Sequence, residues 1–247
     1  MILELDCGNS YVKWRIINGI SELPVAGGIA SQVADLVRDL RSRQLLADID
    51  RCRMVSVRGD LETAEIINTL SGILHVTVNS ASSGCMVGSV INGYREPERL
   101  GVDRWLAIIA AYDLCKQACV VVDLGTAITV DLVTQDGVHL GGYIAPGAAL
   151  LRGQLMAHAQ RIRYDVAQST LALSDLSPGR STAEAVERGC LMMVRSYISA
   201  QIEQAEASLG NGLKIFVTGG DMALANDFPS AVYVPDLVFR GLAMACP

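Results

Sequence analysis

The sequence lacks several features that would place it in a well-known class. It has no run of about 20 apolar residues, so no membrane-spanning helix is predicted, and its start, Met1 to Asp6, lacks the basic segment of a signal peptide. It has no Gly-x-x-x-x-Gly-Lys-Ser/Thr motif and no Gly-x-Ser-x-Gly motif, which excludes a P-loop kinase and a hydrolase nucleophile elbow as templates. We therefore expect a cytoplasmic protein with another kind of chemistry.

Basic residues and histidines are also few. The 20 Lys and Arg are outnumbered by 26 Asp and Glu, and a net charge of −6 argues against nucleic acid as the main partner. The seven cysteines form no Cys-x-x-Cys pair, and His75, His139 and His158 are isolated, so we expect free thiols and no structural zinc. With 51% hydrophobic residues, the 247-residue chain should nevertheless fold, and it is long enough for two domains.

One short pattern occurs twice, as Asp6-Cys7-Gly8-Asn9-Ser10 and as Asp123-Leu124-Gly125-Thr126. Each copy follows an apolar run that we predict to be a strand. The glycine lets the backbone approach a phosphate, and the carboxylate can face a metal ion directly or through water. Either copy alone could be an ordinary turn, because all these residues favour turns. Two copies predict two related half-domains that face one nucleotide.

The periodicity around the two copies predicts an α/β protein in which a βββαβ unit occurs twice, with helices around two mixed sheets. Strands are expected at 2–6, 12–17, 53–57, 74–78, 118–123, 129–134, 138–144 and 214–217. Helices are expected at 32–46, 61–70, 104–116, 148–159, 182–208 and 237–245, and a long functional loop at 80–100. The predicted domains are residues 1–116 and 117–247.

Four blocks of the sequence occur in the order and spacing of one family. They are Asp6-x-Gly8-Asn9-Ser10-x-x-Lys13, Gly101-Val102-Asp103-Arg104, Asp123-x-Gly125-Thr126 and Gly141-Gly142-x-Ile144-x-Pro146-Gly147. In these blocks the chain resembles the type III pantothenate kinases. The resemblance implies an actin-like ATPase fold, in which two RNase H-like domains enclose a nucleotide cleft. It also implies ATP-dependent phosphorylation of pantothenate to 4′-phosphopantothenate, the first step of coenzyme A synthesis, by a homodimer that needs Mg²⁺ and a monovalent cation, K⁺ or NH₄⁺.

The resemblance assigns ATP binding to Asp6, Cys7, Gly8, Asn9, Ser10, Tyr11, Val12, Lys13 and Thr126. In this assignment Asp6 helps to place Mg²⁺ indirectly, and Lys13 neutralises phosphate charge. Asp123 matches the ligand of the monovalent cation, although a buried aspartate that caps the following turn is the simpler alternative. Gly219 and Gly220 would let adenosine lie against the backbone, and a turn explains these glycines almost as well.

The resemblance assigns substrate binding to Tyr94, Gly101, Val102, Asp103, Arg104 and Thr182, with Asp103 as the general base that accepts the pantothenate hydroxyl proton. Each assignment has a structural alternative. Asp103 could be a helix N-cap, Arg104 an exposed first-turn cation, and Tyr94 an aromatic side chain that covers the core. Thr182 lies in Ser181-Thr182-x-Glu184, which also reads as a capping sequence.

Two other functions remain open at this point. The chain could be another small-molecule kinase of the same fold that acts on a sugar or a carboxylic acid, or a non-catalytic nucleotide-binding regulatory protein. The block from Tyr94 to Arg104 favours pantothenate, and the presence of both Asp6 and Asp103 favours an enzyme. We expect ATP, pantothenate and a second copy of the chain as partners, and neither nucleic acid nor a membrane.

Overall fold

The computed structural model describes residues 1–19, 21–173, 175–226, 228 and 230–247. The chain folds into two compact units. The first contains Met1–Leu114 together with Asp236–Pro247, and the second contains Cys115–Pro235.

The first unit is built on a five-stranded mixed sheet of order β3-β2-β1-β4-β5. Its strands are β1 (Ile2–Cys7), β2 (Val12–Asn18), β3 (Ser21–Ala30), β4 (Arg51–Ser56) and β5 (Val78–Ser80). Its helices are α1 (Val33–Ser42), α2 (Asp60–Leu74), α3 (Val102–Cys115, whose last residue belongs to the second unit) and α7 (Leu237–Ala245). Strand β1 pairs antiparallel with β2 and parallel with β4, so the predicted strand, turn and strand at the N-terminus are confirmed.

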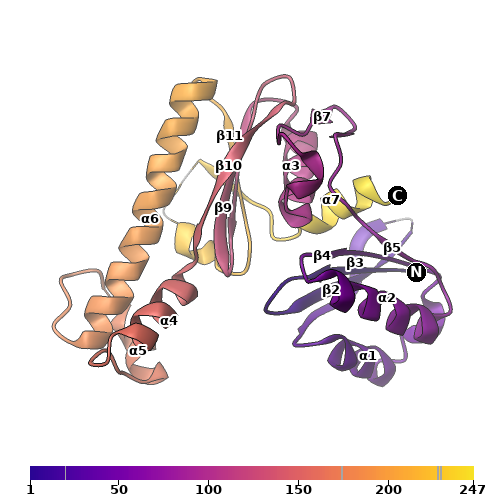
Figure 1. The fold of residues 1–247 in the computed structure, drawn as a ribbon, viewed down its shortest axis with the longest axis horizontal. Helices are drawn as coiled ribbons and strands as arrows, with labels where there is room; N and C mark the ends of the chain where they lie inside the picture. The colour runs from indigo at the N-terminus through magenta and orange to yellow at the C-terminus, as the bar shows by residue number, and fades with distance from the viewer. Residues whose placement is uncertain (20, 174, 227, 229) are drawn as a thin grey trace. The chain divides into compact units, whose positions relative to one another are not determined.

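The two faces of this sheet differ in chemistry. Alternate residues of a strand point to opposite faces, so Leu3 and Leu5 lie on the face that packs, with α1 and α2, into the main core. Glu4 points to the other face, where it is fully buried and pairs with Arg15 and Arg53. Helix α7 packs against β1 and β4, and Figure 1 shows α1 and α2 on the side of the sheet opposite to α7. A buried ion cluster therefore holds β1, β2 and β4 together.

The predicted loop at 80–100 contains a small hairpin of β6 (Met86–Val87) and β7 (Val90–Ile91), followed by the 3-10 turn η2 (Pro97–Arg99). Buried Asn92 holds this segment in shape. Its amide nitrogen donates to the carbonyl oxygens of Gly84 (3.0 Å) and Pro97 (3.1 Å), and its side-chain oxygen accepts from the Tyr94 N–H (3.0 Å). The loop that leads into α3 is thus ordered by its own polar contacts.

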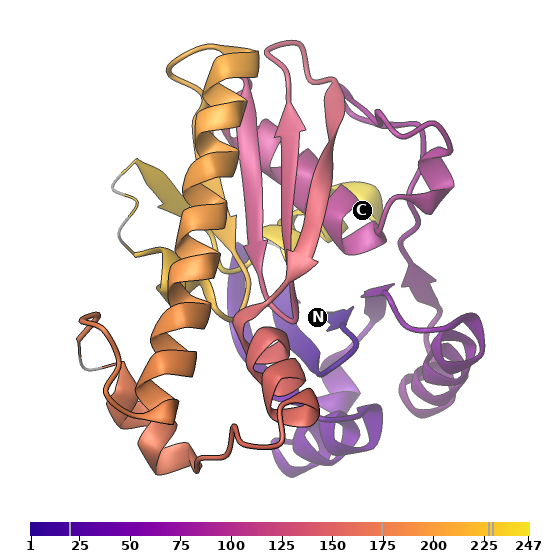
Figure 2. The same cartoon turned by 60° about the vertical axis from the view of Figure 1, so that its left-hand side comes forward.

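The second unit repeats the topology of the first, because its sheet has the order β10-β9-β8-β11-β12. Its strands are β8 (Cys119–Leu124), β9 (Ala127–Val133), β10 (His139–Pro146), β11 (Lys214–Thr218) and β12 (Ala231–Tyr233). Its helices are α4 (Ala148–His158), α5 (Val166–Ala172) and α6 (Thr182–Leu209), with a 3-10 turn η3 (Met222–Ala225). Figure 2 shows the long α6 running beside the strands, and α6 packs against β8, α4 and α5. The predicted internal duplication is confirmed.

Several elements differ from the predictions. Strands β3 and β12 and helix α5 were not expected, a short 3-10 turn η1 (Leu46–Asp48) follows α1, and α2 continues to Leu74, so that the strand expected at 74–78 begins only at Val78. The closing helix α7 groups with the first unit, because it packs against β1 and β4, whereas the predicted division placed it in the second domain. None of the helices in the described ranges has the length and apolar character needed to cross a membrane.

Candidate functional site

The first Asp-x-Gly turn joins β1 to β2 within the first unit. Asp6 lies directly opposite Lys13 in the antiparallel ladder, so that a carboxylate and an ammonium group flank the turn on neighbouring strands. The side chains of Asn9, Ser10 and Tyr11 at the tip are exposed. A Cβ atom on Gly8 would lie 3.4 Å from the Tyr11 carbonyl oxygen, in ordinary van der Waals contact. The exposed tip of the turn therefore lies beside one carboxylate and one ammonium group.

The electrostatics of Asp6 connect this turn with the start of α3. Burial raises the pKa of Asp6 from 3.8 to about 6, the nearby Lys13 ammonium lowers it, and the Asp103 carboxylate raises it further by like-charge repulsion. The fold therefore brings Asp6 and Asp103, which are far apart in the sequence, close enough to interact. Two adjacent carboxylates that repel one another are stabilised by a bound cation.

Two predicted ATP-binding residues have side chains that face the core. Cys7 and Val12 are fully buried, so only their backbone atoms are available to a ligand. Burial raises the pKa of Cys7 to about 12, so its thiol stays protonated at neutral pH. Their contribution to this site is the backbone that shapes the turn.

Arg58 supports the same turn and was not predicted from the sequence. It follows β4, and its Nε donates to the carbonyl oxygen of Gly8 (2.9 Å), while its Nη1 pairs with Glu62 (2.6 Å). The Arg58 side chain is only 10% exposed, so the contact is shielded from water. In the sequence Arg58 is only an arginine between a strand and a helix. Nothing there reveals that it contacts the turn after the neighbouring strand.

Asp103 lies in the first turn of α3. The Trp105 N–H donates to the Gly101 carbonyl oxygen (2.9 Å), so Gly101 rather than Asp103 has the N-cap position, and the N-cap alternative for Asp103 is wrong. Oδ1 of Asp103 accepts from the Arg104 N–H (2.8 Å). A Cβ atom on residue 101 would lie 2.9 Å from that Oδ1, so Gly101 makes room for the carboxylate. Val102 begins the helix between them.

Arg104 is buried, so the alternative of an exposed first-turn cation is also wrong. Its Nη1 donates to the Tyr94 hydroxyl oxygen (2.8 Å), and its guanidinium carbon lies 5.6 Å from the centre of the Tyr94 ring. By contrast, Arg95 and Arg99 are exposed, and Arg99 pairs with Glu96 (2.8 Å). The structure brings Tyr94, Arg104 and Asp103 together on the loop and first turn of one helix.

The second Asp-x-Gly turn joins β8 to β9 within the second unit, and two glycines from other parts of the unit pack closely against it. A Cβ atom on Gly219 would lie 2.2 Å from the Leu124 carbonyl oxygen and 2.4 Å from Asp123 Oδ1. Gly219 also has a φ of +98°, which favours glycine. A Cβ atom on Gly147 would lie 2.1 Å from the Gly125 carbonyl oxygen. The backbone at Gly219 therefore lies close to the Asp123 carboxylate, and the backbone at Gly147 lies close to the turn that follows it.

Thr126 and Thr182 also belong to the second unit, and both are exposed. Thr182 is the first residue of α6. Ser181 caps the helix: its hydroxyl oxygen accepts from the Glu184 N–H (3.3 Å), and the Glu184 carboxylate accepts from the Ser181 N–H (3.1 Å). The capping reading of this segment is therefore correct for Ser181, and the Thr182 side chain remains open to a ligand.

The donor sets of the two turns differ. Within the described ranges, no three His, Cys, Asp or Glu side chains gather as a metal cage. The first turn offers the Asp6 carboxylate, which fits Mg²⁺ held by one or two carboxylates together with nucleotide phosphates. The second offers the Asp123 carboxylate and the Leu124 carbonyl oxygen, which both lie beside Gly219; oxygen donors of this kind fit a large cation such as K⁺.

Comparison with known proteins gives consistent results. Residues 2–204 match the family model described as type III pantothenate kinase. The chain is 53% identical over 248 residues to the type III pantothenate kinase of Pseudomonas aeruginosa, and 48% identical over 249 residues to that of Azotobacter vinelandii. Each alignment covers 100% of this chain and 99% of the relative.

Solved structures show the same fold at lower identity. A Campylobacter jejuni protein described as a conserved Baf family transcriptional activator aligns with a TM-score of 0.59 and 24% identity, over 98% of this chain and 95% of the other. Component A of (R)-2-hydroxyglutaryl-CoA dehydratase from Acidaminococcus fermentans aligns with a TM-score of 0.52 and 16% identity, over 99% and 95%. Together with the repeated sheet order, these matches identify two RNase H-like units of the actin-like ATPase type.

Proposed function

Because the chain belongs to the type III pantothenate kinase family, we propose that it transfers the γ-phosphate of ATP to pantothenate, giving ADP and 4′-phosphopantothenate in the first step of coenzyme A synthesis. The observation that carries this proposal is the electrostatic interaction between the Asp6 and Asp103 carboxylates within one unit. Phosphoryl transfer needs a place for the metal-bound phosphates and a group that orients the attacking hydroxyl, and these two carboxylates supply one each.

The first turn is proposed to hold the phosphates of ATP. Backbone N–H groups around Gly8 and the side chains of Asn9 and Ser10 would donate hydrogen bonds to phosphate oxygens, and Lys13 would offset their charge. Asp6 would hold Mg²⁺ beside these phosphates, directly or through water, and the ion would supply positive charge that offsets theirs. Arg58 keeps the turn in place through the Gly8 carbonyl oxygen.

Asp103 is proposed as the general base. Its carboxylate would accept the proton of the pantothenate hydroxyl as that oxygen attacks the γ-phosphate. In a loose transition state the proton departs late, so a carboxylate of low basicity is sufficient and its main contribution is to orient the hydroxyl. The hydrogen bond from the Arg104 N–H to Oδ1 restricts the orientation of the Asp103 carboxylate.

The carboxylate of pantothenate is proposed to bind Arg104. A buried guanidinium is a strong and planar partner for a carboxylate, and its contact with Tyr94 restricts its orientation. Gly101 and Val102 would contact the substrate through their backbone, and Thr182 through its exposed hydroxyl. This carboxylate site distinguishes pantothenate from a neutral sugar of similar size.

K⁺ or NH₄⁺ is proposed to bind at the second turn. The Asp123 carboxylate and the surrounding backbone carbonyl oxygens are its donors, and Gly219 and Gly147 are needed because a side chain at either position would fill the space beside them. Thr126, exposed in the same turn, is assigned to a phosphate oxygen of the nucleotide. The cation would offset negative charge near those phosphates.

The protein is also proposed to be a homodimer. Large apolar side chains are exposed on the helices of the second unit, at Leu150, Leu155, Val166, Leu171, Met192 and Met193. Such a concentration on α4, α5 and α6 is typical of an interface. Light scattering should give twice the chain mass for the native protein and a smaller mass for the double variant Met192→Glu/Met193→Glu. The exposed Leu61→Glu serves as the control, and a native monomer would contradict the proposal.

The kinase activity is tested by a coupled assay of ADP release in a K⁺ buffer with Mg²⁺ and ATP. We expect ADP release that depends on added pantothenate and that glucose or acetate does not support. Release that is equal with and without pantothenate would contradict the assigned acceptor. Release with glucose or acetate would favour another small-molecule kinase, whereas nucleotide binding without ADP release under any condition would favour the regulatory protein.

A further inference from the structure

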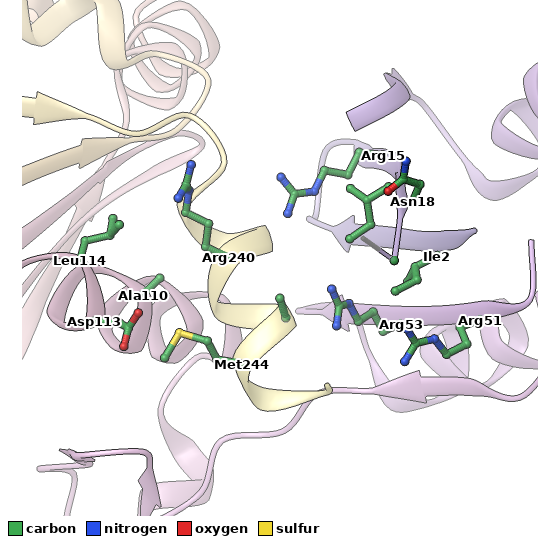
Figure 3. Close-up of a pocket in the computed structure, with 13 residues that line it drawn as sticks. Ile2, Arg15, Asn18, Arg51, Arg53, Ala110, Asp113, Leu114, Arg240 and Met244 are labelled. Atoms are coloured by element: carbon green, nitrogen blue, oxygen red, sulfur yellow. The ribbon is translucent and has the colours of Figure 1, made fainter. Parts of the chain in front are cut away.

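A cavity of about 470 Å³ lies in the first unit, at the end of the sheet where β1 and β4 begin and β2 ends (Figure 3). Its walls are the start of β1 at Ile2, the end of β2 at Asn18, the C-terminal half of α3 and helix α7. Strand β1 is six residues long, so its start lies roughly 17 Å from the Asp-x-Gly turn at its other end. The cavity is therefore separate from the site described above.

The lining of this cavity is rich in cations, and Figure 3 shows their side chains. Four arginines line it, namely Arg15, Arg51, Arg53 and Arg240. The buried Glu4 is shared between Arg15 and Arg53, and Asp236 is shared between Arg15 and Arg240 (3.0 and 2.9 Å). With Asp113 as a further lining carboxylate, the four arginines retain one positive charge in excess.

Two of these arginines keep hydrogen-bond donors for a ligand. Arg240 bonds to Asp236 through Nε, and Arg51, the first residue of β4, is exposed. A guanidinium has five N–H donors in a planar fork that matches the oxygens of phosphate and carboxylate groups. In contrast, Arg53 uses its donors on Glu4 and on the Cys246 carbonyl oxygen. Arg51 is therefore the main cation that a ligand would meet.

Apart from Asn18 and Gly19, the rest of the lining is apolar. The apolar residues are Ile2, Ile17, Ala110, Leu114, Ala243 and Met244. A cavity of this size that combines apolar walls with a few convergent polar groups is typical of a small-molecule site. We propose that it binds a small phosphate monoester with a short apolar chain, the phosphate held by the arginines and the chain lying against α3 and α7. This site does not depend on the proposed kinase reaction.

The proposal is tested by titrating the full-length protein with butyl phosphate, which carries both a dianion and an apolar chain. We expect saturable binding by calorimetry, weaker binding of butyrate, and none of butanol. Arg51→Gln should lower the affinity for butyl phosphate about tenfold or more, as expected when a charge-assisted contact is removed, and Arg240→Gln should lower it less. The exposed Arg41→Gln on α1 is the matched control and should leave it unchanged.

The first turn could also bind a phosphate, so the experiment must separate the two sites. Lys13→Gln weakens a phosphate held at the first turn and should leave the binding of butyl phosphate at the cavity unchanged. Amide resonances of Asn18 and Leu114 should shift on titration in the wild-type protein. The proposal is overturned if no saturable binding occurs, if butanol binds as well as butyl phosphate, or if Lys13→Gln abolishes binding that Arg51→Gln leaves intact.

Discussion

Replacing Asp6 by asparagine should make the first unit more stable at neutral pH while it abolishes phosphoryl transfer. Keeping this carboxylate ionised in the folded protein is unfavourable, because burial raises its pKa from 3.8 to about 6. That difference corresponds to about 3 kcal/mol of free energy of unfolding, which asparagine would recover because it is neutral at every pH. A residue kept for its charge rather than for stability is expected where a metal-bound phosphate must be placed.

The sign of the pH dependence follows from the raised pKa. Between pH 3.8 and about 6 the folded protein binds a proton at Asp6 that the unfolded chain has released, so raising the pH through this window lowers the stability. This loss of stability is absent below the pKa of Asp6 in the unfolded chain and complete above its pKa in the folded protein. The wild-type protein and Asp6→Asn should therefore have similar stabilities near pH 4 and differ by about 3 kcal/mol near pH 7.5.

Urea unfolding of the nucleotide-free protein, followed by tryptophan fluorescence, measures this difference. Both tryptophans, Trp14 and Trp105, are buried in the first unit, so the signal reports the unit that contains Asp6. The exposed Asp48→Asn is the matched control and should change the free energy of unfolding by less than about 0.5 kcal/mol. An Asp6→Asn variant that is less stable than the wild type at neutral pH, or a difference independent of pH, would refute the reasoning.

Four further perturbations test other parts of the structure. Glu4→Gln should destabilise the first unit by about 3–5 kcal/mol in urea unfolding, because it leaves two buried arginines without their shared partner; a loss below about 1 kcal/mol would count against this. Gly219→Ala should cost about 1–3 kcal/mol or more and lower K⁺ activation, since its Cβ would meet the Leu124 carbonyl oxygen, whereas the neighbouring Gly220→Ala has open space and should do neither. Exchanging K⁺ for Na⁺ should sharply lower the rate of the wild type and have little effect on Asp123→Asn, and equal wild-type rates in both salts would remove Asp123 from the cation site. Arg104→Lys should raise KM for pantothenate about tenfold with a smaller change in kcat, because a lysine cannot form the planar carboxylate contact; an unchanged KM would exclude this contact.

The repeated topology could be predicted because each half carries its signal locally. A strand, an Asp-x-Gly turn and a second strand lie within about 17 residues in both halves, and the observed strands match the expected ones closely. Strand β3 was missed because Pro24, Gly27 and Gly28 are unfavourable in a strand. It is an edge strand, where a proline is tolerated, and a Cβ atom on Gly28 would lie 3.0 Å from the Trp14 indole. The need for a glycine at position 28 therefore arises only once β2 and β3 are paired.

The candidate site could likewise be predicted only where its residues are contiguous in the sequence. The residues of each turn and the block from Gly101 to Arg104 are contiguous, so the sequence alone could single them out. The interaction of Asp6 with Asp103, the support from Arg58 and the crowding of Gly219 against Asp123 each join distant segments, and only the fold reveals them. The cavity lined by arginines depends on two helices and three strands, so no local pattern predicts it.

The most direct test of the account is detection of the product itself. With ATP, Mg²⁺, K⁺ and pantothenate, phosphorus NMR should show a new phosphate monoester formed in equal amount to ADP by the wild-type protein. Asp103→Asn should form it about 10²- to 10⁴-fold more slowly while its urea unfolding shows a folded protein that still binds ATP. Absence of the monoester with the wild type, or its formation by Asp103→Asn at the wild-type rate, would contradict the account.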